Sequence, residues 1–208
     1  MELHEAARTM GTCRYFTPEP VPDDVLVPAL DMARFAPTGG NRQGVRFVVV
    51  KDEAKRRQLA EWYLPSWKRY IKAVDLATAP ATIRNANHFA EHLHEVPILV
   101  VVCARVGDLL ATDARLDRLS VVGGCSIYPS VQNFLLGCRE QGLGTALTTL
   151  LCYSEPEVKG LLGIPDDYLT AAHIAVGWPE RPFPTRLSRR PLSEVAFLDS
   201  FGSAYPDA

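Results

Sequence analysis

The sequence predicts a single α+β domain in which helices flank a mixed sheet. Apolar runs of strand length alternate with helical stretches along the chain, which indicates layered helices and strands. The first strand lacks the glycine fingerprint that cradles a phosphate, so a doubly wound nucleotide-binding sheet is disfavoured. No linker or repeat divides the 208 residues. We therefore expect one domain over residues 1–208, with an extended C-terminal arm from about residue 178.

The N-terminal part predicts two helices separated by extended chain. Residues 3–8 are expected to form a short helix, and residues 12–20 are expected to be extended. A second helix begins at Pro22, because proline suits a first turn and the acids that follow suit the positive end of the helix dipole. Pro28 removes a hydrogen bond from the interior of that helix, which predicts either a kink or a later start. Pro37 ends the helix.

The central part predicts two strands and the helices around them. The β-branched run at residues 45–50 is typical of a strand, and the charged run after it opens a helix that ends near Trp62. The stretch from there to Pro80 is less regular, and its aromatic rings are interpreted as a core edge or as a lid over a substrate. A helix over residues 81–94 then precedes a strand at residues 98–103.

The C-terminal half predicts two further helices and two further strands. Residues 124–141 form a long helix that is apolar on most sides and hence buried. A strand follows over residues 145–151, and a capping-box pattern at Ser154 starts another helix. Residues 171–176 are the last core strand, and the proline-rich basic chain after them is the arm.

The composition excludes several classes of function. Apolar residues make up 47%, charged residues 22%, and the net charge is −2, which gives no reason to expect binding to nucleic acid or to an anionic membrane. The N-terminus lacks the features of a secretion signal, and the longest hydrophobic run, residues 96–104, is too short to cross a bilayer. The five cysteines are scattered and form no C-x-x-C pair, which argues against a disulfide framework. These features predict a cytoplasmic protein.

Two motifs that could carry chemistry are incomplete. His88 and His92 fit the H-x-x-E-H pattern of zinc proteases, but no acidic third ligand stands out downstream. A metal site is therefore not expected, and a solvated or ligand-facing helix is preferred. Cys125-Ser126 follows two glycines as in a nucleophile turn, yet Tyr128 stands where the last glycine belongs. Hydrolase chemistry stays a weak alternative.

The loop at residues 37–43 is the first candidate for a cofactor site. It combines small and amide residues with bare backbone, which suits the close approach of a flat ligand with polar edges. These residues are Thr38, Gly39, Gly40, Asn41 and Gln43. Arginines in two other segments could hold a phosphate through paired hydrogen bonds, namely Arg14 near the N-terminus and Arg189 with Arg190 in the arm.

Four blocks of sequence, in order along nearly the whole chain, resemble the FMN-dependent nitroreductase family. They are residues 14–23, residues 36–43 leading into 46–50, residues 128–136 through 142–145, and residues 163–168 with 177–179 and 189–192. Each block is loose by itself, but the ordered set is specific.

The resemblance implies a homodimeric sandwich with FMN in a cleft at the subunit interface. In such a protein the N-terminal segment contacts the flavin phosphate and ring edge, and the small-residue loop covers the cofactor from the partner subunit. The backbone after the Gly-Leu-Gly turn faces the flavin N5 edge, and the C-terminal basic pair closes on the phosphate. The cofactor-binding residues so implied are, in the same order, Thr12 and Arg14; Thr38, Gly39, Asn41 and Gln43; Thr148, Thr149 and Leu150; and Arg189 and Arg190.

One contact stays open within the resemblance, and two positions depart from it. The candidates to face the flavin N1/O2 edge are His88, His92 and His94. Met10-Gly11 stands where many members carry an additional arginine, so Arg8 or the C-terminal arginines are expected to take its part. Gly44-Val45 replaces a common Pro-Trp, which is expected to widen the space near the loop and to alter the substrate pocket.

The implied activity has two half-reactions at one flavin. NADH or NADPH delivers hydride to N5 and leaves, and a small-molecule acceptor such as a nitroaromatic or a quinone is then reduced in the same cleft. No side chain is expected to act as a catalytic acid or nucleophile. Alternatives on the same scaffold are dehalogenases, dehydrogenating oxidases, flavin-consuming synthases and flavin binding without turnover. The variable regions 62–80 and 107–120 decide among them.

Overall fold

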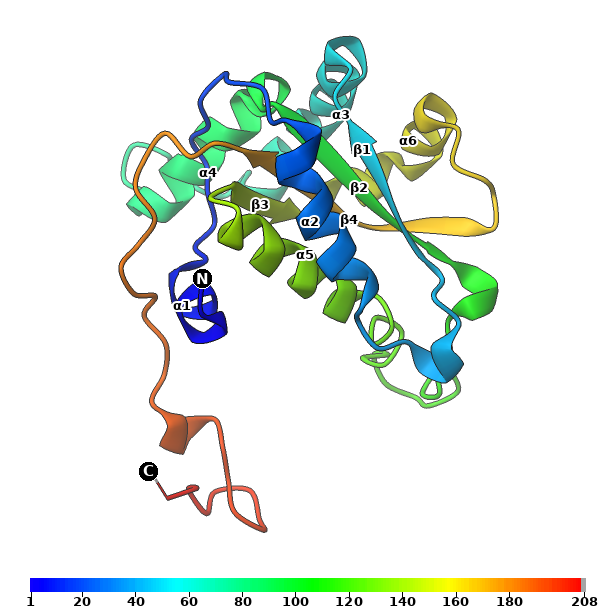
Figure 1. Cartoon of the computed structure of the whole chain (residues 1–208), viewed down its shortest axis with the longest axis vertical. Coiled ribbons are helices and arrows are strands. Elements are labelled where there is room, and N and C mark those ends of the chain that lie inside the picture. The colour runs from blue at the N-terminus through cyan, green and yellow to red at the C-terminus, as the bar shows by residue number, and fades with distance from the viewer. Residues whose placement is uncertain (207–208) are drawn as a thin grey trace.

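The computed structural model describes residues 1–206 and confirms the α+β class (Figure 1). Its sheet has the order β1-β2-β4-β3, and each neighbouring pair is antiparallel. The strands are β1 (Val45–Val50), β2 (Ile98–Arg105), β3 (Gly144–Thr148) and β4 (Tyr168–Gly177). The mixed character expected of the sheet is confined, within residues 1–206, to one isolated parallel bridge between Thr12 and Thr145.

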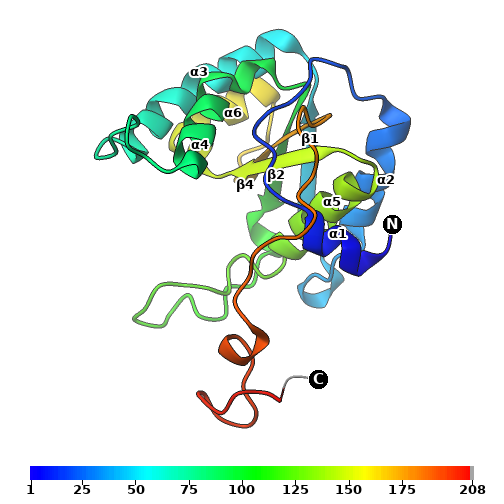
Figure 2. The same ribbon diagram turned by 90° about the vertical axis from the view of Figure 1, so that its left-hand side faces the viewer.

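One face of the sheet is covered by α2 (Asp23–Arg34) and α5 (Tyr128–Glu140), with α1 (Leu3–Thr9) beside them (Figure 2). Gly137 allows α2 and α5 to approach closely, because a Cβ at this position would lie 2.7 Å from the Cα of Ala29. Ser130 Oγ donates to the carbonyl of Ala33 at 2.6 Å and ties the two helices together. Pro28 lies inside α2, so the later helix start that it predicted is wrong.

The other face is covered by α3 (Glu53–Tyr70), α4 (Ala81–Glu91) and α6 (Glu155–Leu162) (Figure 2). The expected end of α3 near Trp62 is wrong, because the helix continues through Pro65 to Tyr70. Tyr63, Ser66 and Trp67 are buried there at helical spacing. Their burial stabilises the helix beyond the proline.

Other element boundaries differ from expectation by a few residues. The helix at 81–94 ends at Glu91 and is followed by a short 3-10 turn, Leu93–Glu95. α5 begins four residues late, at Tyr128, with Pro129 in its first turn. β3 ends at Thr148, because the chain turns there into a 3-10 helix, η4 (Leu150–Ser154).

Two apolar clusters, one on each face of the sheet, form the core. β2 and β4 lie between the outer strands. β2 is almost wholly buried, as is β4 from Ala172 onward, and their side chains alternate between the two clusters. Residues 178–206 leave the sheet and run past α1 away from the body (Figure 1). Within residues 1–206, no helix is long and apolar enough to span a membrane.

Candidate functional site

The segment at residues 11–17 lies between the edge of β3 and the start of the C-terminal arm. The Cys13 N–H donates to the carbonyl of Thr145 at 2.8 Å, and the Thr17 N–H donates to the carbonyl of Trp178 at 2.9 Å. Gly144 permits this pairing, since a Cβ there would lie 2.7 Å from Cys13 Sγ. These backbone contacts hold Thr12 and Arg14 beside the end of β3.

A hollow of about 300 Å³, here called the aromatic hollow, opens next to this segment. Rings from α3 and α4 line one wall, and the end of β3 lines the other. The structure brings five of the predicted cofactor residues together here, namely Thr12, Arg14, Thr148, Thr149 and Leu150. The rings are Tyr63, Trp67, Tyr70 and Phe89. A flat apolar ring system with polar edges fits such walls.

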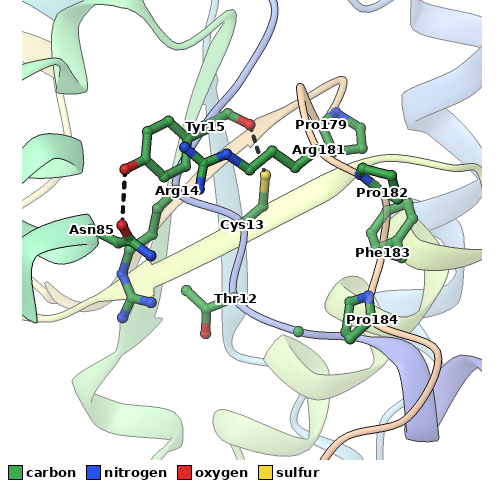
Figure 3. A pocket seen from close by; sticks show the side chains of 11 residues that line it. Thr12, Cys13, Arg14, Tyr15, Asn85, Pro179, Arg181, Pro182, Phe183 and Pro184 are labelled. Atoms are coloured by element: carbon green, nitrogen blue, oxygen red, sulfur yellow. Dashed lines mark hydrogen bonds between the residues drawn. The ribbon is translucent and has the colours of Figure 1, made fainter. Parts of the chain in front are cut away.

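A second hollow of about 190 Å³, here called the basic hollow, shares Thr12 and Arg14 with the first (Figure 3). Its remaining lining comes from Gly11, Cys13 and Tyr15, from Asn85 on α4, and from the arm residues Pro179 and Arg181 to Pro184. The Tyr15 hydroxyl donates to Asn85 Oδ1 at 2.9 Å. The guanidinium of Arg181 lies 3.6 Å from the centre of the Tyr15 ring. Two arginines thus border one small hollow.

Arg14 stands at the junction of the two hollows. Its guanidinium makes no hydrogen bond or ion pair with any residue in 1–206. It also lines a third hollow that contains Glu95 and Glu180, yet neither carboxylate lies within ion-pair distance of it. A half-buried guanidinium with five free donors is suited to bind an anion or the acceptor edge of a ligand.

Tyr63 supplies the polar group of the aromatic wall. Its hydroxyl oxygen lies 3.5 Å from Thr148 Oγ1, which also accepts from the Leu150 N–H at 3.3 Å. Burial raises the pKa of Tyr63, and the charge of Arg14 opposes that rise. The phenol therefore stays protonated and can donate to a ligand. Of the two interpretations of the aromatic stretch, Tyr63 and Trp67 fit the core edge, and Tyr70 is an exposed rim of the hollow.

The candidate histidines do not line the aromatic hollow. The rings of Tyr15 and His88 stack at 4.4 Å, and those of His88 and His92 stack at 4.0 Å. Burial and the neighbouring His92 lower the pKa of His88. His94 lies apart, 3.6 Å from Glu95. A role for any of them at the flavin N1/O2 edge stays a prediction. Within residues 1–206, no group of three or more His, Cys, Asp or Glu side chains could hold a metal ion.

The loop at residues 38–43 lies at the end of the molecule away from α4 and lines neither hollow (Figures 1 and 2). The Gly39 N–H donates to Ser126 Oγ at 3.0 Å, and the Gln43 N–H donates to Thr38 Oγ1 at 3.1 Å. Asn41 and Gln43 have φ values of 54° and 53°. Non-glycine residues adopt this left-handed region at an energetic cost, and such strain clusters at functional sites.

Space beside this loop is smaller than the sequence predicted. A Cβ at Gly44 would lie 2.6 Å from the Cβ of Asp108, so Asp108 fills the volume that a bulkier residue would need. The expected gain of space is therefore absent at Gly44, and the effect of Val45 on the space near the loop stays a prediction.

Arg189 and Arg190 also line neither hollow. Arg189 Nη1 donates to the carbonyl of Ser188 at 2.7 Å, and Arg190 lies 3.4 Å from Glu194. The arm contacts the N-terminal segment just before them, where the Leu187 N–H donates to the carbonyl of Arg8 at 2.8 Å. Within one chain the predicted cofactor residues thus fall into three groups: one assembled at the hollows, one in the distant loop and one in the arm.

The family model "Nitroreductase family" matches residues 8–178. The chain belongs to the nitroreductase family. This result confirms the resemblance seen in the sequence.

Relatives within the family differ in their reactions. The 5,6-dimethylbenzimidazole synthase of Rhodospirillum rubrum is 29% identical over 194 residues, covering 86% of this chain and 85% of that protein. Oxidized iodotyrosine deiodinase, crystallised with FMN and 3-iodo-L-tyrosine, has a TM-score of 0.73 at 23% identity and covers 96% of this chain and 100% of that one. The NADPH:FMN oxidoreductase of Vibrio harveyi, complexed with NAD+, has a TM-score of 0.68 at 20% identity and covers 96% and 77%. The family therefore does not fix the reaction.

Several residues of this nitroreductase-family site were missed by sequence reasoning. Asn85 and Arg181 line the basic hollow, and Phe89 lines the aromatic one. Asn85 lies one turn before His88 in a helix that was examined only for its histidines. Arg181 lies in the arm, whose basic character was predicted without a role for this residue. Its contact with the Tyr15 ring, which places it at the hollow, is visible only in three dimensions.

Proposed function

We propose that this protein is an FMN-dependent oxidoreductase. In this proposal NADH or NADPH reduces the flavin, and a nitroaromatic, quinone or similar small acceptor then reoxidises it in a ping-pong reaction. The observation that carries the proposal is Arg14, which has no hydrogen-bond or ion-pair partner within residues 1–206 and stands at the junction of an aromatic and a basic hollow.

The described residues fit FMN in kind. FMN joins a flat ring system to a phosphate through a polar chain, and the site joins an aromatic-walled hollow to one bordered by Arg14 and Arg181. The polar chain would pass Thr12, which lines both hollows. The phosphate would fall to Arg181, which lines only the basic hollow, because the donors of a guanidinium match phosphate oxygens in pairs, and Arg14 at the junction would serve the ring end. The crystal structures of family-fold neighbours with FMN named in them support the same assignment.

When bound, FMN supplies the acceptance and delivery of hydride at its N5 atom. The protein supplies orientation and charge. Arg14 would stabilise negative charge on the ring edge, because a fixed cation in a half-buried site needs no reorganisation during the reaction. Tyr63 and Trp67 would exclude water from the ring, and the end of β3 at Thr148 would set its polar edge. No described side chain needs to act as an acid or a nucleophile.

A homodimer is part of the proposal, because one chain leaves the site incomplete. The strained loop at residues 38–43 and the arginines of the arm do not reach the hollows of their own chain. The arm also exposes large apolar side chains, including Phe201 at 94% and Val195 at 60%. Such exposure is typical of a surface that a partner covers. We place the loop over the cofactor of a second copy.

A cytoplasmic location is likewise proposed. All five cysteines are free thiols in the structure. Free thiols are favoured in a reducing compartment.

The first experiment is an absorbance spectrum of the purified protein. We expect a yellow protein that bleaches when NADH or NADPH is added without oxygen, and that regains its colour when a nitroaromatic or a quinone follows. Initial rates against both substrates should give parallel double-reciprocal lines. A colourless protein that does not bind added FMN would overturn the proposal.

The relatives support two alternatives that the same preparation separates. A deiodinase and a flavin-consuming synthase are among the matched proteins, so dehalogenation and flavin breakdown are tested directly. Release of iodide from 3-iodotyrosine would favour the dehalogenase. Loss of flavin with formation of 5,6-dimethylbenzimidazole in air would favour the synthase. Tight FMN binding with no reduction by either nicotinamide in stopped flow would favour a non-catalytic flavin-binding protein.

A further inference from the structure

His173 is a histidine in the middle of an otherwise apolar strand. It lies in β4, between Ala172 and Ile174, and only 1% of its surface is exposed. β2 places Val101 opposite it on one side, and β3 places Thr148 opposite it on the other. The imidazole therefore lies at the centre of the sheet, remote from solvent.

Neither ring nitrogen of His173 has a hydrogen-bond partner within residues 1–206. A buried polar group without a partner destabilises a fold, so an apolar side chain would pack better at this position. Burial also lowers the pKa of His173 to about 4, so the ring is neutral near pH 7 and offers one donor and one acceptor. Packing alone does not explain a histidine here.

The polar groups around the ring connect it to the proposed site. The carbonyl of Thr148 faces the imidazole closely enough to favour its protonated form, although hydrogen-bond geometry is not reached. Glu155 is the charged group that acts on the ring, and it raises the pKa more than the Thr148 carbonyl does, but its carboxylate already accepts from the N–H and the hydroxyl of Thr170. Thr148 is thus the backbone group whose carbonyl acts on the His173 ring.

Thr148 is also the last residue of β3 and part of the wall of the aromatic hollow. Residues opposite each other on antiparallel strands project to the same face, so His173 lies directly behind this part of the wall. The chain turns into η4 immediately afterwards, through Thr149 and Leu150. A small shift of this turn would close or open the contact with the imidazole.

We propose that His173 is a positioning residue: when the turn at residues 148–150 shifts to meet the cofactor, the Thr148 carbonyl accepts a hydrogen bond from the imidazole, and this bond sets how the backbone of the turn meets the ligand. The inference rests on the proposed function, because the turn matters only if FMN binds beside it. His173 itself touches no ligand. Its effect passes through one carbonyl and the turn that follows.

Three variants test this inference. His173→Leu keeps the volume and removes the donor, His173→Gln restores a donor and an acceptor, and Val101→Ala loosens the packing on the opposite side of the ring. We expect His173→Leu to weaken FMN binding about fivefold, the effect of one hydrogen bond, and to shift the flavin absorption maxima and the midpoint potential. His173→Gln should recover most of the binding. Val101→Ala should lower the thermal midpoint with no change in spectrum or potential.

The outcomes separate the inference from the proposed function. A wild-type protein that binds no FMN defeats the proposed function before any variant is compared. If the wild type binds FMN and His173→Leu shows the same affinity, spectrum and potential, then His173 positions nothing and the inference is wrong. If Val101→Ala shifts the potential as much as His173→Leu does, the effect comes from core packing, and the inference is also wrong.

Discussion

Two of the three groups of predicted cofactor residues, the assembled group at the hollows and the separated group in the loop, are built differently. Thr12, Arg14 and residues 148–150 meet because backbone hydrogen bonds join the N-terminal segment to β3. The loop at residues 38–43 is exposed, holds two non-glycine residues at positive φ, and stands at the other end of the chain. A single chain can assemble the first group by itself, and it cannot bring the second group to it. This difference is the reason for proposing a site divided between two copies.

Mixing two variants gives the largest expected effect. Arg14→Ala damages the assembled group, and Asn41→Ala damages the loop, so each homodimer should have two defective sites. When the two chains are co-expressed, each mixed dimer should contain one intact site and one doubly altered site. With random pairing, about a quarter of all sites regain activity.

The control for this prediction is a double variant that carries both substitutions in one chain. It is co-expressed with the wild-type chain. Turnover per protomer with a quinone acceptor, at a fixed concentration of added FMN, is the measurement. If activity does not return on mixing the single variants, the loop serves the site of its own chain, and the division drawn above is wrong.

The second prediction concerns His173, which lies in the sheet opposite Thr148 of the assembled group. Unfolded His173 takes up a proton below its ordinary pKa of about 6.5. The folded ring does so only near pH 4. The free energy of unfolding should therefore decrease by about 3 kcal/mol as the pH falls from about 6.5 to 4. The free energy of unfolding of His173→Leu should not show this decrease.

The measurement is urea unfolding of both proteins at a fixed protomer concentration, since a dimer's apparent stability depends on concentration. Other groups titrate in the same range, so the difference between the two curves is the quantity compared. Parallel pH profiles for wild type and His173→Leu would show that the ring is not buried as a neutral group.

Much of the fold could be read from the sequence, for physical reasons that differ between elements. The run at residues 45–50 was predicted to the residue, because a β-branched segment bounded by a glycine and a charged pair has little choice of conformation. α3 was underestimated, because the burial of Tyr63 and Trp67 against other elements is a tertiary effect. β3 was overestimated, because no local signal marks the turn after Thr148.

The candidate site could be predicted where residues that lie together in the site are also adjacent in the sequence. Thr148, Thr149 and Leu150 are adjacent in the chain and stay together in the hollow. Arg181 and Asn85 were missed, because they are brought together from an arm and a helix that share no motif. The loop was recognised by its small residues, but its place over the cofactor of a second chain stays a proposal.

The third prediction tests how much the charge of Arg14 contributes to ligand binding by the assembled group. Arg14→Ala removes a guanidinium that has no partner within residues 1–206, so the loss should appear in ligand binding and not in folding. We expect FMN affinity to fall by about 10- to 100-fold, which corresponds to about 1.5–3 kcal/mol for a charge-assisted contact. Arg14→Lys should recover part of it, because a point charge replaces a two-pronged donor.

Arg57→Ala is the matched control, since Arg57 pairs with Glu53 on the exposed side of α3 and lines neither hollow. Flavin fluorescence titration measures all three affinities. Equal losses for Arg14→Ala and Arg57→Ala would indicate a general effect of charge and would remove Arg14 from the site.

The smallest expected effect tests the strain of the separated group. Gln43→Gly removes a side chain from a left-handed position, which relieves about 1 kcal/mol, and glycine's greater freedom when unfolded takes back about half of that. The net stabilisation should be a few tenths of a kcal/mol, whereas Gln58→Gly inside α3 should destabilise by about 1 kcal/mol. If Gln43 faces the cofactor of the partner chain, FMN binding should weaken while urea stability rises. A loop that loses stability on this change would be shaped by its own chain's folding, and its strain would carry no functional meaning.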